Sequence, residues 1–338
     1  MRKPSLENLL SRAITCAAVV TLALVMAGAR SFAEPQQTAS AAPAQQSAAP
    51  LPQLADGVVY TVSPVAADPQ IKRFTADNVV LFEHGVARKA RLLVFFSGTG
   101  GTPASGWPFL ETAAKAGYRV IGVEYDNAIS VPQTCGRNPD PACSDRFREK
   151  RIFGDAESAE IDDLPNESVV NRLTKLLRYL DAQHRGEGWG QYLRNGEPDW
   201  SRIAVSGQSQ GAGMAAYIAK KKSVARVIVL SGAWDRVEAT KEWAPWVTSP
   251  SATPLDRWYA AYHQRESRAD AMKLAYEALK IPPDHIRMLT LDPNPQNKMP
   301  AGADAYHVSM VAPGVTPVDA NGQPAYAADW AFMIGSAK

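Results

Sequence analysis

Four near-continuous apolar runs constrain the fold of this chain most strongly: "ARLLVFFSG" (90–98), "YRVIGVEY" (118–125), "RIAVSG" (202–207) and "ARVIVLSG" (225–232). Each is rich in β-branched and aromatic residues and does not alternate with polar ones, which is typical of parallel strands buried on both faces. Between them, residues 168–184 place apolar side chains at helical spacing. Strands that alternate with helices over this length predict a mostly parallel, doubly wound α/β sheet.

The C-terminal third of the chain departs from this pattern. Residues 236–283 are rich in Trp, Tyr and Ala with scattered charge, and we expect a helical insertion, a cap, after the strand at 225–232. A further strand at 285–291 and a helix at 324–335 then complete the domain. The sequence therefore predicts one α/β domain over 57–338 with a cap insertion at about 236–283.

The N-terminus has the pattern of an export signal. Basic residues precede an uncharged apolar run at 13–29, and the small residues Ser31 and Ala33 follow it. This order predicts a signal peptide over 1–33, cleaved after Ala33, and an exported protein that is periplasmic or secreted. An uncleaved membrane anchor is the alternative, because the apolar run is at the lower limit for a span. Residues 34–56 are rich in Ala, Pro and Gln and predict a disordered tether.

Charge and residue spacing exclude several classes of partner. The chain has 36 basic and 34 acidic residues, and removal of 1–33 would leave it close to neutral. A near-neutral chain without a basic block predicts no nucleic-acid partner and no stable membrane association after signal cleavage. We find no His, Asp or Glu cluster with metal-ligand spacing, so we expect neither a metal nor a cofactor. The sequence leaves the oligomeric state open.

Two cysteines follow the predicted signal peptide. Cys135 and Cys143 flank "GRNPDPA", a short loop with two prolines. In an exported protein this spacing predicts a disulfide, and a metal site is the weaker alternative because histidines are distant in sequence.

The motif "GQSQG" (207–211) lies between a predicted strand and a predicted helix. A G-x-S-x-G turn in this context holds its serine, here Ser209, above the sheet, because glycines on either side let strand and helix approach closely. A simple tight turn with a polar residue is the structural alternative. The strand, turn and helix together favour Ser209 as a nucleophile.

On these residues the sequence resembles the α/β-hydrolase superfamily, and more narrowly a group of exported bacterial serine hydrolases and esterases of poorly defined substrate. The resemblance spans about 90–335 and includes "LLVFFSGTGGTP", "SGQSQGAGMAAYIAK", "RVIVLSGAWD", "APWVTSPSATPLDRWYAAYH" and "YHVSMV". It implies an α/β-hydrolase fold and serine hydrolase chemistry.

A serine hydroxyl needs a general base that is oriented by a carboxylate. This fold supplies its base after the nucleophile, and His307 falls between the last predicted strand and the C-terminal helix. We therefore expect His307 to be the base, with a histidine satisfied by core hydrogen bonds as the alternative. For the acid we favour Asp235, which follows the strand at 225–232, and keep Asp292, which precedes a proline after the strand at 285–291, as the second candidate.

Catalysis also needs donors for the developing oxyanion. We expect the backbone N–H of Gln210 to be one, because it follows the nucleophile at the start of a helix. The second is expected from Thr99, or from the adjacent Gly98, in the Gly-rich loop "SGTGGTP". A phosphate-binding loop is the weaker interpretation, because the Lys-Ser/Thr pair is missing.

The aromatic residues of the expected cap predict a substrate pocket lined by Trp234, Trp246 and Trp258. A roofed apolar pocket would accept the acyl or aryl part of a small-molecule or polymeric ester, although the same residues could simply pack the insertion on the sheet. The leading hypothesis is carboxylic-ester hydrolysis through an acyl-enzyme. A serine peptidase or amidase with the same triad and a non-catalytic exported binding protein are the alternatives.

Overall fold

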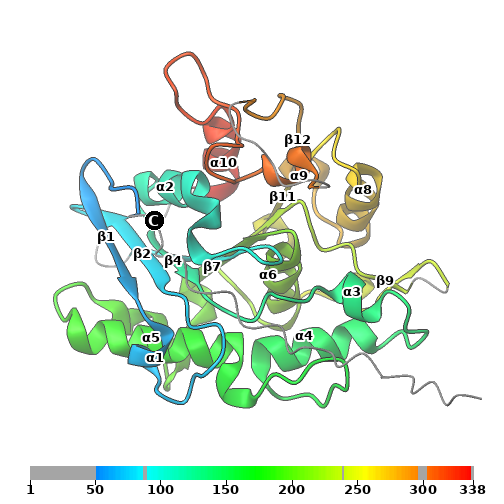
Figure 1. Ribbon diagram of the computed structural model, residues 1–338, viewed down its shortest axis with the longest axis horizontal. Helices are drawn as coiled ribbons and strands as arrows, with labels where there is room; N and C mark the ends of the chain where they lie inside the picture. Colours follow the sequence, from blue (N-terminus) through cyan, green and yellow to red (C-terminus); the bar gives the residue numbers. More distant parts are fainter. Residues whose placement is uncertain (1–50, 87–89, 238–239, 296–302, 336–338) are drawn as a thin grey trace, which may run out of the picture. The chain divides into compact units, whose positions relative to one another are not determined.

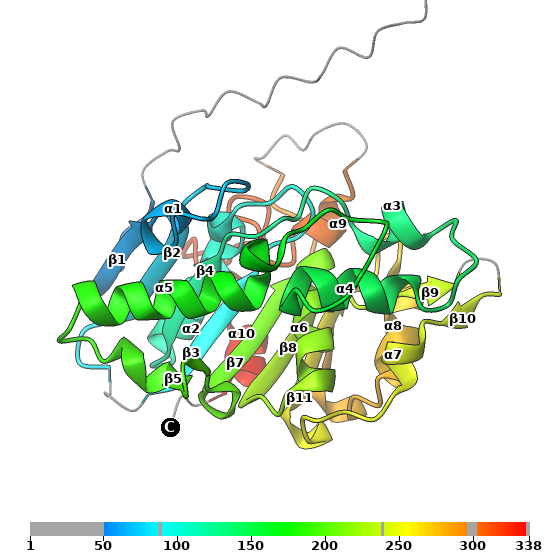
Figure 2. The ribbon, with the colours of Figure 1, turned by 90° about the horizontal axis from the view of Figure 1, so that it is seen from below.

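An eight-stranded sheet forms the centre of the fold (Figures 1 and 2), with strand order β1-β2-β4-β3-β7-β8-β11-β12. Its strands are β1 (Gly57–Val62), β2 (Asn78–Glu83), β3 (Leu92–Phe96), β4 (Arg119–Val123), β7 (Ile203–Gln208), β8 (Arg226–Leu230), β11 (Trp258–His263) and β12 (Ile286–Leu289). β2 runs antiparallel to both of its neighbours, and the pairs from β4 to β12 are parallel. The predicted mostly parallel α/β sheet is thus confirmed.

The computed structural model describes residues 51–86, 90–237, 240–295 and 303–335. The expected signal peptide and most of the expected tether lie outside these residues. The last part of that tether is described: Leu54, just before β1, is buried and joins the core beneath β2, whereas Pro52, Gln53, Ala55 and Asp56 are exposed. In the described part of the chain, no helix is long and apolar enough to cross a membrane.

Helices and short strands complete the fold. The α-helices are α1 (Pro64–Ala67), α2 (Trp107–Lys115), α3 (Val131–Cys135), α4 (Cys143–Phe153), α5 (Val169–Gln183), α6 (Gln210–Lys221), α7 (Pro245–Thr248), α8 (Ala269–Ala278), α9 (Ala305–Val308) and α10 (Ala327–Ile334). Two small hairpins pair β5 (Leu193–Arg194) with β6 (Glu197–Pro198) and β9 (Arg236–Val237) with β10 (Glu242–Trp243). Short 3₁₀ turns are at Pro103–Gly106, Pro165–Glu167, Trp189–Tyr192, Trp200–Arg202, Leu255–Arg257 and Pro283–His285.

The central strands are buried on both faces, as their composition predicts. In β3, Leu92, Val94 and Phe96 belong to the core under α5 and α6, whereas Leu93 and Phe95 belong to the core under α2 and α10. Figure 2 shows this layering, with α4, α5 and α6 on one side of the sheet and α2 and α10 on the other. Such sheets position functional residues at the carboxyl ends of their strands.

The predicted helix over 168–184 is confirmed as α5, but its first residue is capped differently. Ser168 is the N-cap, where the sequence favours Asn166 as the capping residue, and its hydroxyl accepts a hydrogen bond from the backbone N–H of Asn171 at 3.3 Å. Asn166 lies two residues before this position, inside the short 3₁₀ turn Pro165–Glu167.

The expectation of a helical cap over 236–283 is wrong at its centre. Residues 258–263 form β11, which lies inside the main sheet and pairs in parallel with both β8 and β12. Trp258, Ala260 and Tyr262 pack on one face of the sheet, and Ala261 packs on the other. This alternation is that of a strand. Trp258 and Tyr262, which suggested a cap, are therefore part of the sheet, and the loop after β11 lies at its carboxyl edge.

Candidate active site

Ser209 occupies the turn between β7 and α6. Its backbone dihedral angles are φ 57° and ψ −119°, in a region that a non-glycine residue enters only under strain. The N–H of Ser209 donates to the carbonyl of Leu230 in β8 at 2.9 Å, and its own carbonyl accepts from Gly213 at 3.3 Å. Hydrogen bonds to β8 and to α6 therefore hold this serine in its strained conformation.

Glycines around this turn allow backbones to approach each other closely. A Cβ atom on Gly207 would lie 2.3 Å from the carbonyl group of Gly211, and one on Gly211 would lie 2.0 Å from the carbonyl oxygen of Phe96. A Cβ atom on Gly232 would lie 2.2 Å from the carbonyl oxygen of Ser209. Because such distances exclude any side chain, the motif glycines are required by packing as well as by the turn.

Ser209 opens into a small pocket of about 60 Å³, which Thr99, Gln210 and Trp234 also line. Gln210 is the first residue of α6, so its backbone N–H lies among those that have no intrahelical partner. The hydroxyl of Thr99 lies 3.3 Å from Gln210 Oε1. Gly98 is also close to the serine, because a Cβ atom on Gly98 would lie 3.2 Å from the Cβ of Ser209. The three residues expected to form the oxyanion hole are thus gathered at the serine.

His307 lies in α9, beside the same turn. Gln208, the residue before Ser209, donates its side-chain amide to the carbonyl of His307 at 3.2 Å. The ring of His307 packs edge-on against Trp234, with a centroid distance of 6.0 Å. Its side chain is 20% exposed, so the imidazole is partly open to solvent, and His307 is not among the residues that line the pocket of Ser209.

The carboxylate on His307 is Glu266, in the loop after β11. Its Oε2 lies 2.7 Å from His307 Nδ1, and its side chain is fully buried. Its Oε1 accepts two hydrogen bonds, from the hydroxyl of Ser231 at 2.9 Å and from the backbone N–H of His263 at 2.8 Å. A carboxylate bound in this way fixes the imidazole with Nδ1–H towards Glu266 and leaves Nε2 as an acceptor.

Asp304 connects the two segments that carry this pair. Its carboxylate accepts from the backbone N–H groups of Tyr306 at 3.1 Å and His307 at 3.2 Å, and from Ser267 at 2.6 Å. Burial opposes ionisation, but these hydrogen bonds, led by the one from Ser267, hold the pKa of Asp304 below its usual value. One ionised carboxylate thus joins the loop of Glu266 to the helix of His307.

Asp235, the acid favoured from the sequence, has a different set of partners. Its two oxygens bind Arg148 Nε at 2.6 Å and Nη2 at 2.7 Å, and Oδ2 also accepts from the indole of Trp246 at 3.0 Å. Both charged side chains of this pair are buried. Asp235 therefore joins the segment between β8 and β9 to α4, and the geometry does not place it on His307.

Asp292, the second candidate, lies on the surface. Its side chain is 74% exposed, and it contacts Arg265 and, at 3.2 Å, the hydroxyl of Tyr306. Glu266 is not among the site residues predicted from the sequence, because the segment that forms β11 was expected to belong to the cap. The signal for it is present, since the aromatic run "WYAAYH" ends three residues before this glutamate.

Of the three tryptophans expected to line the pocket, the structure places Trp234 there. Trp246 is 2% exposed and donates to Asp235 and Ser144, and Trp258 is fully buried at the start of β11. These two belong to the core, because they lie between the sheet and its covering helices. The expectation for them is therefore not matched.

The predicted disulfide between Cys135 and Cys143 is confirmed, with Cα atoms 5.7 Å apart. It joins the end of α3 to the start of α4. Val131 and Pro132 of α3 line the pocket of Ser209, and Arg148 of α4 does so as well. The disulfide thus steadies one wall of the site.

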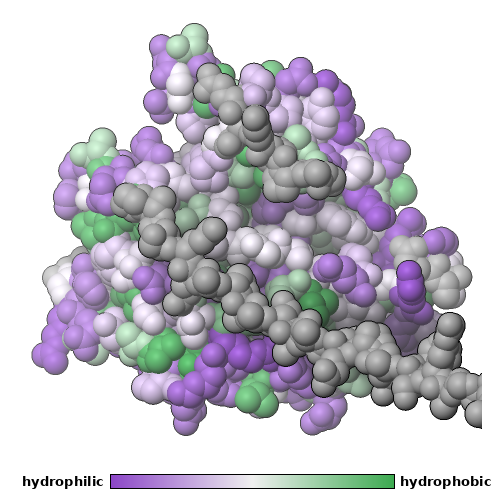
Figure 3. Space-filling model, viewed as in Figure 1, coloured by the Kyte–Doolittle hydropathy of each residue, from purple (hydrophilic) through white to green (hydrophobic). Residues whose placement is uncertain are grey.

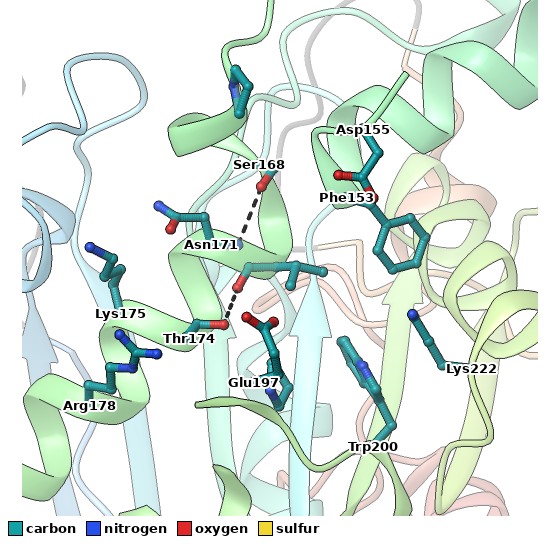
Figure 4. Close-up of a pocket in the computed structure, with 13 residues that line it drawn as sticks. Phe153, Asp155, Ser168, Asn171, Thr174, Lys175, Arg178, Glu197, Trp200 and Lys222 are labelled. Carbon is teal, nitrogen blue, oxygen red and sulfur yellow. Dashed lines mark hydrogen bonds between the residues drawn. The ribbon is translucent and has the colours of Figure 1, made fainter. Parts of the chain in front are cut away.

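A separate cavity of about 580 Å³ lies along α5 (Figure 4). Phe153, Trp200, Lys175 and Glu197 are among its lining residues, and Ser209 is not. Its charges are of both signs, and no catalytic pair lines it.

Comparisons with known proteins return weak likenesses only. No protein-family model matches the chain, and no curated protein sequence matches it. Among solved structures, the chain is similar to a bacterial heroin esterase, with 17% identity, a TM-score of 0.42, and 83% of this chain and 84% of that chain covered. It is also similar to a thermophilic esterase from the Planctomycetes species Thermogutta terrifontis, with 14% identity, a TM-score of 0.37 and coverage of 69% and 81%. Esterase B from Lactobacillus rhamnosis shows 12% identity, a TM-score of 0.39 and coverage of 69% and 74%.

Proposed function

We propose that the protein is a serine hydrolase of carboxylic esters, with Ser209 as nucleophile, His307 as general base and Glu266 as the acid. The observation that carries this proposal is the fully buried Glu266 carboxylate on His307 Nδ1, beside a strained serine turn. A binding protein would have no use for strain at this serine together with an oriented imidazole.

In the proposed reaction, Ser209 Oγ attacks the carbonyl carbon of the ester while His307 Nε2 accepts the hydroxyl proton. The oxyanion is stabilised by the backbone N–H of Gln210 and by a donor from Thr99 or Gly98. The tetrahedral intermediate collapses, the C–O bond breaks, and the imidazolium protonates the leaving alcohol. Water, activated by the same imidazole, then hydrolyses the acyl-enzyme and releases the acid. Glu266 stabilises the imidazolium in both halves.

The test is turnover of p-nitrophenyl esters of graded acyl length, with a matched p-nitroanilide as the amide substrate. Ser209→Ala should abolish ester cleavage with an unchanged melting temperature, because the hydroxyl is the nucleophile. Ser223→Ala is the control, since Ser223 is exposed and lies beyond α6. Residual turnover in Ser209→Ala within tenfold of the parent would overturn the proposal. Faster cleavage of the anilide than of the ester would favour the amidase alternative.

We also propose that the chain is exported after cleavage behind Ala33. The disulfide supports this, because such bonds persist in oxidising compartments. N-terminal sequencing of the protein from the producing cells tests it: a mature chain that begins at Glu34 is expected, and an intact N-terminus in the cytoplasmic fraction would contradict it.

A further inference from the structure

A second hollow adjoins the pocket of Ser209. It has a volume of about 530 Å³, and it shares Val131, Pro132, Trp234 and Asp235 with that pocket. A space of this size holds the body of a small organic ligand. The pocket at Ser209, about 60 Å³, has room only for the reacting group. The rest of a bound substrate would therefore extend into this larger hollow, which we call the outer cleft.

Basic side chains from three segments converge on the outer cleft. Arg137 follows α3, Arg236 lies in β9, and Arg268 is the N-cap of α8; Lys241 also lines it. Figure 1 shows α3, β9 and α8 on the same side of the molecule, and Figure 3 shows that this side of the face is largely hydrophilic. Segments far apart in sequence thus bring like charges together, although like charges repel each other.

The carboxylate in the outer cleft does not neutralise these charges. Asp235 is the acidic residue among those that line it, and Arg148 binds both of its oxygens from the core side. Within the described ranges, Arg137, Arg236 and Arg268 have no carboxylate partner. The field in the outer cleft is therefore positive.

Arg236 is held in the wall of the outer cleft by an aromatic ring. Its guanidinium carbon lies 4.4 Å from the centre of the Trp243 ring, which fixes the side chain. Its Nε is buried and has no hydrogen-bond partner among the described residues. Among the described residues this guanidinium has no carboxylate partner, so its charge in the wall of the outer cleft is uncompensated.

We propose that the substrate is an ester that carries a carboxylate at a distance from the scissile bond, with that carboxylate bound in the outer cleft. Arginine favours this ligand because its planar guanidinium matches the two oxygens of a carboxylate. This inference rests on the proposed function, because it assigns the substrate class of the same serine site.

The experiment compares kcat/KM for mono-p-nitrophenyl adipate and p-nitrophenyl hexanoate, which have the same acyl chain length and differ in the terminal carboxylate. The parent should prefer the adipate by about tenfold at low ionic strength, and the preference should shrink in high salt because salt screens exposed charges. The double variant Arg137→Gln/Arg268→Gln should lower the ratio of adipate to hexanoate at least about threefold. Both residues are exposed, so the fold should not change.

Arg185→Gln is the matched control, since it removes an exposed positive charge at the end of α5, outside the outer cleft. Its ratio should equal that of the parent. Cleavage of hexanoate without a preference for adipate, or an unchanged ratio in the double variant, would overturn the inference and leave the proposed function intact. Failure to cleave either ester would overturn both.

Discussion

Replacement of Glu266 by Gln changes almost nothing in shape and should nearly abolish activity. In the parent, Oε1 accepts from Ser231 and from the backbone N–H of His263, and Oε2 faces His307 Nδ1. The backbone N–H cannot reorient, so the glutamine carbonyl must face it. A glutamine turned the other way would leave that buried donor without an acceptor, at a cost of about 1–3 kcal/mol. The glutamine NH₂ therefore faces His307.

This orientation imposes the wrong tautomer on the imidazole. A donating NH₂ requires His307 Nδ1 to accept, so the ring proton moves to Nε2, which can then no longer take the proton of Ser209. The corresponding change in serine proteases lowers kcat by about 10⁴, which is ~5.5 kcal/mol of transition-state free energy. We expect a loss of about 10³ to 10⁴ in kcat with little change in KM.

The assay is kcat and KM for p-nitrophenyl butyrate at equal folded fractions, with the melting temperature measured alongside. Asp292→Asn is the exposed control, and it should keep activity near the parental value. If Glu266→Gln retains activity within tenfold while Asp235→Asn or Asp292→Asn loses 10³, then the proposed acid is wrong.

Three further predictions concern stability. Asp235→Asn should lower the free energy of unfolding by about 3–5 kcal/mol, because the buried Arg148 guanidinium loses its counter-charge. Activity per folded molecule should stay within tenfold of the parent. An unchanged melting temperature would contradict the predicted loss of stability. Reduction of the Cys135–Cys143 disulfide should lower the free energy of unfolding by about 2.5 kcal/mol. It should also raise KM, because the wall of the site formed by α3 becomes looser. Unfolding curves and kinetics with and without reductant would show or refute these two effects. Burial raises the pKa of Glu124 to about 7, with Arg172 opposing it, so the stability from this protonated side chain is complete below about pH 4.5 and is lost as pH rises through 7. Relative to the parent, Glu124→Gln should be more stable by about 2–3 kcal/mol at pH 8. If denaturant titrations gave the same difference in unfolding free energy between variant and parent at pH 5 and at pH 8, this prediction would be ruled out.

The sequence predicted those parts of the fold whose pattern is local. The four apolar runs became β3, β4, β7 and β8, because strands buried on both faces must be apolar throughout. The serine turn could also be predicted, because no residue other than glycine fits the close contacts at positions 207 and 211. The disulfide followed from the short spacing of Cys135 and Cys143 together with the predicted export.

The acid of the site could not be predicted in the same way, because it depends on strand order. Asp235 does follow a strand, but Arg148 arrives from α4, and nothing local in the sequence indicates that pairing. Glu266 reaches His307 only because β11 inserts between β8 and β12 and carries its loop to the same edge. Tertiary pairing therefore decided which carboxylate meets the imidazole.

The most direct test of the proposed chemistry is covalent labelling with a fluorophosphonate, followed by intact mass and peptide mapping. Such probes phosphonylate a serine only where a base activates it and donors stabilise the oxyanion. We predict one adduct per chain, located on Ser209, with loss of esterase activity in proportion to labelling, and no adduct in Ser209→Ala or, on the same timescale, in Glu266→Gln. An unlabelled Ser209 in a folded parent, or an adduct at another serine that accounts for the activity, would contradict the account.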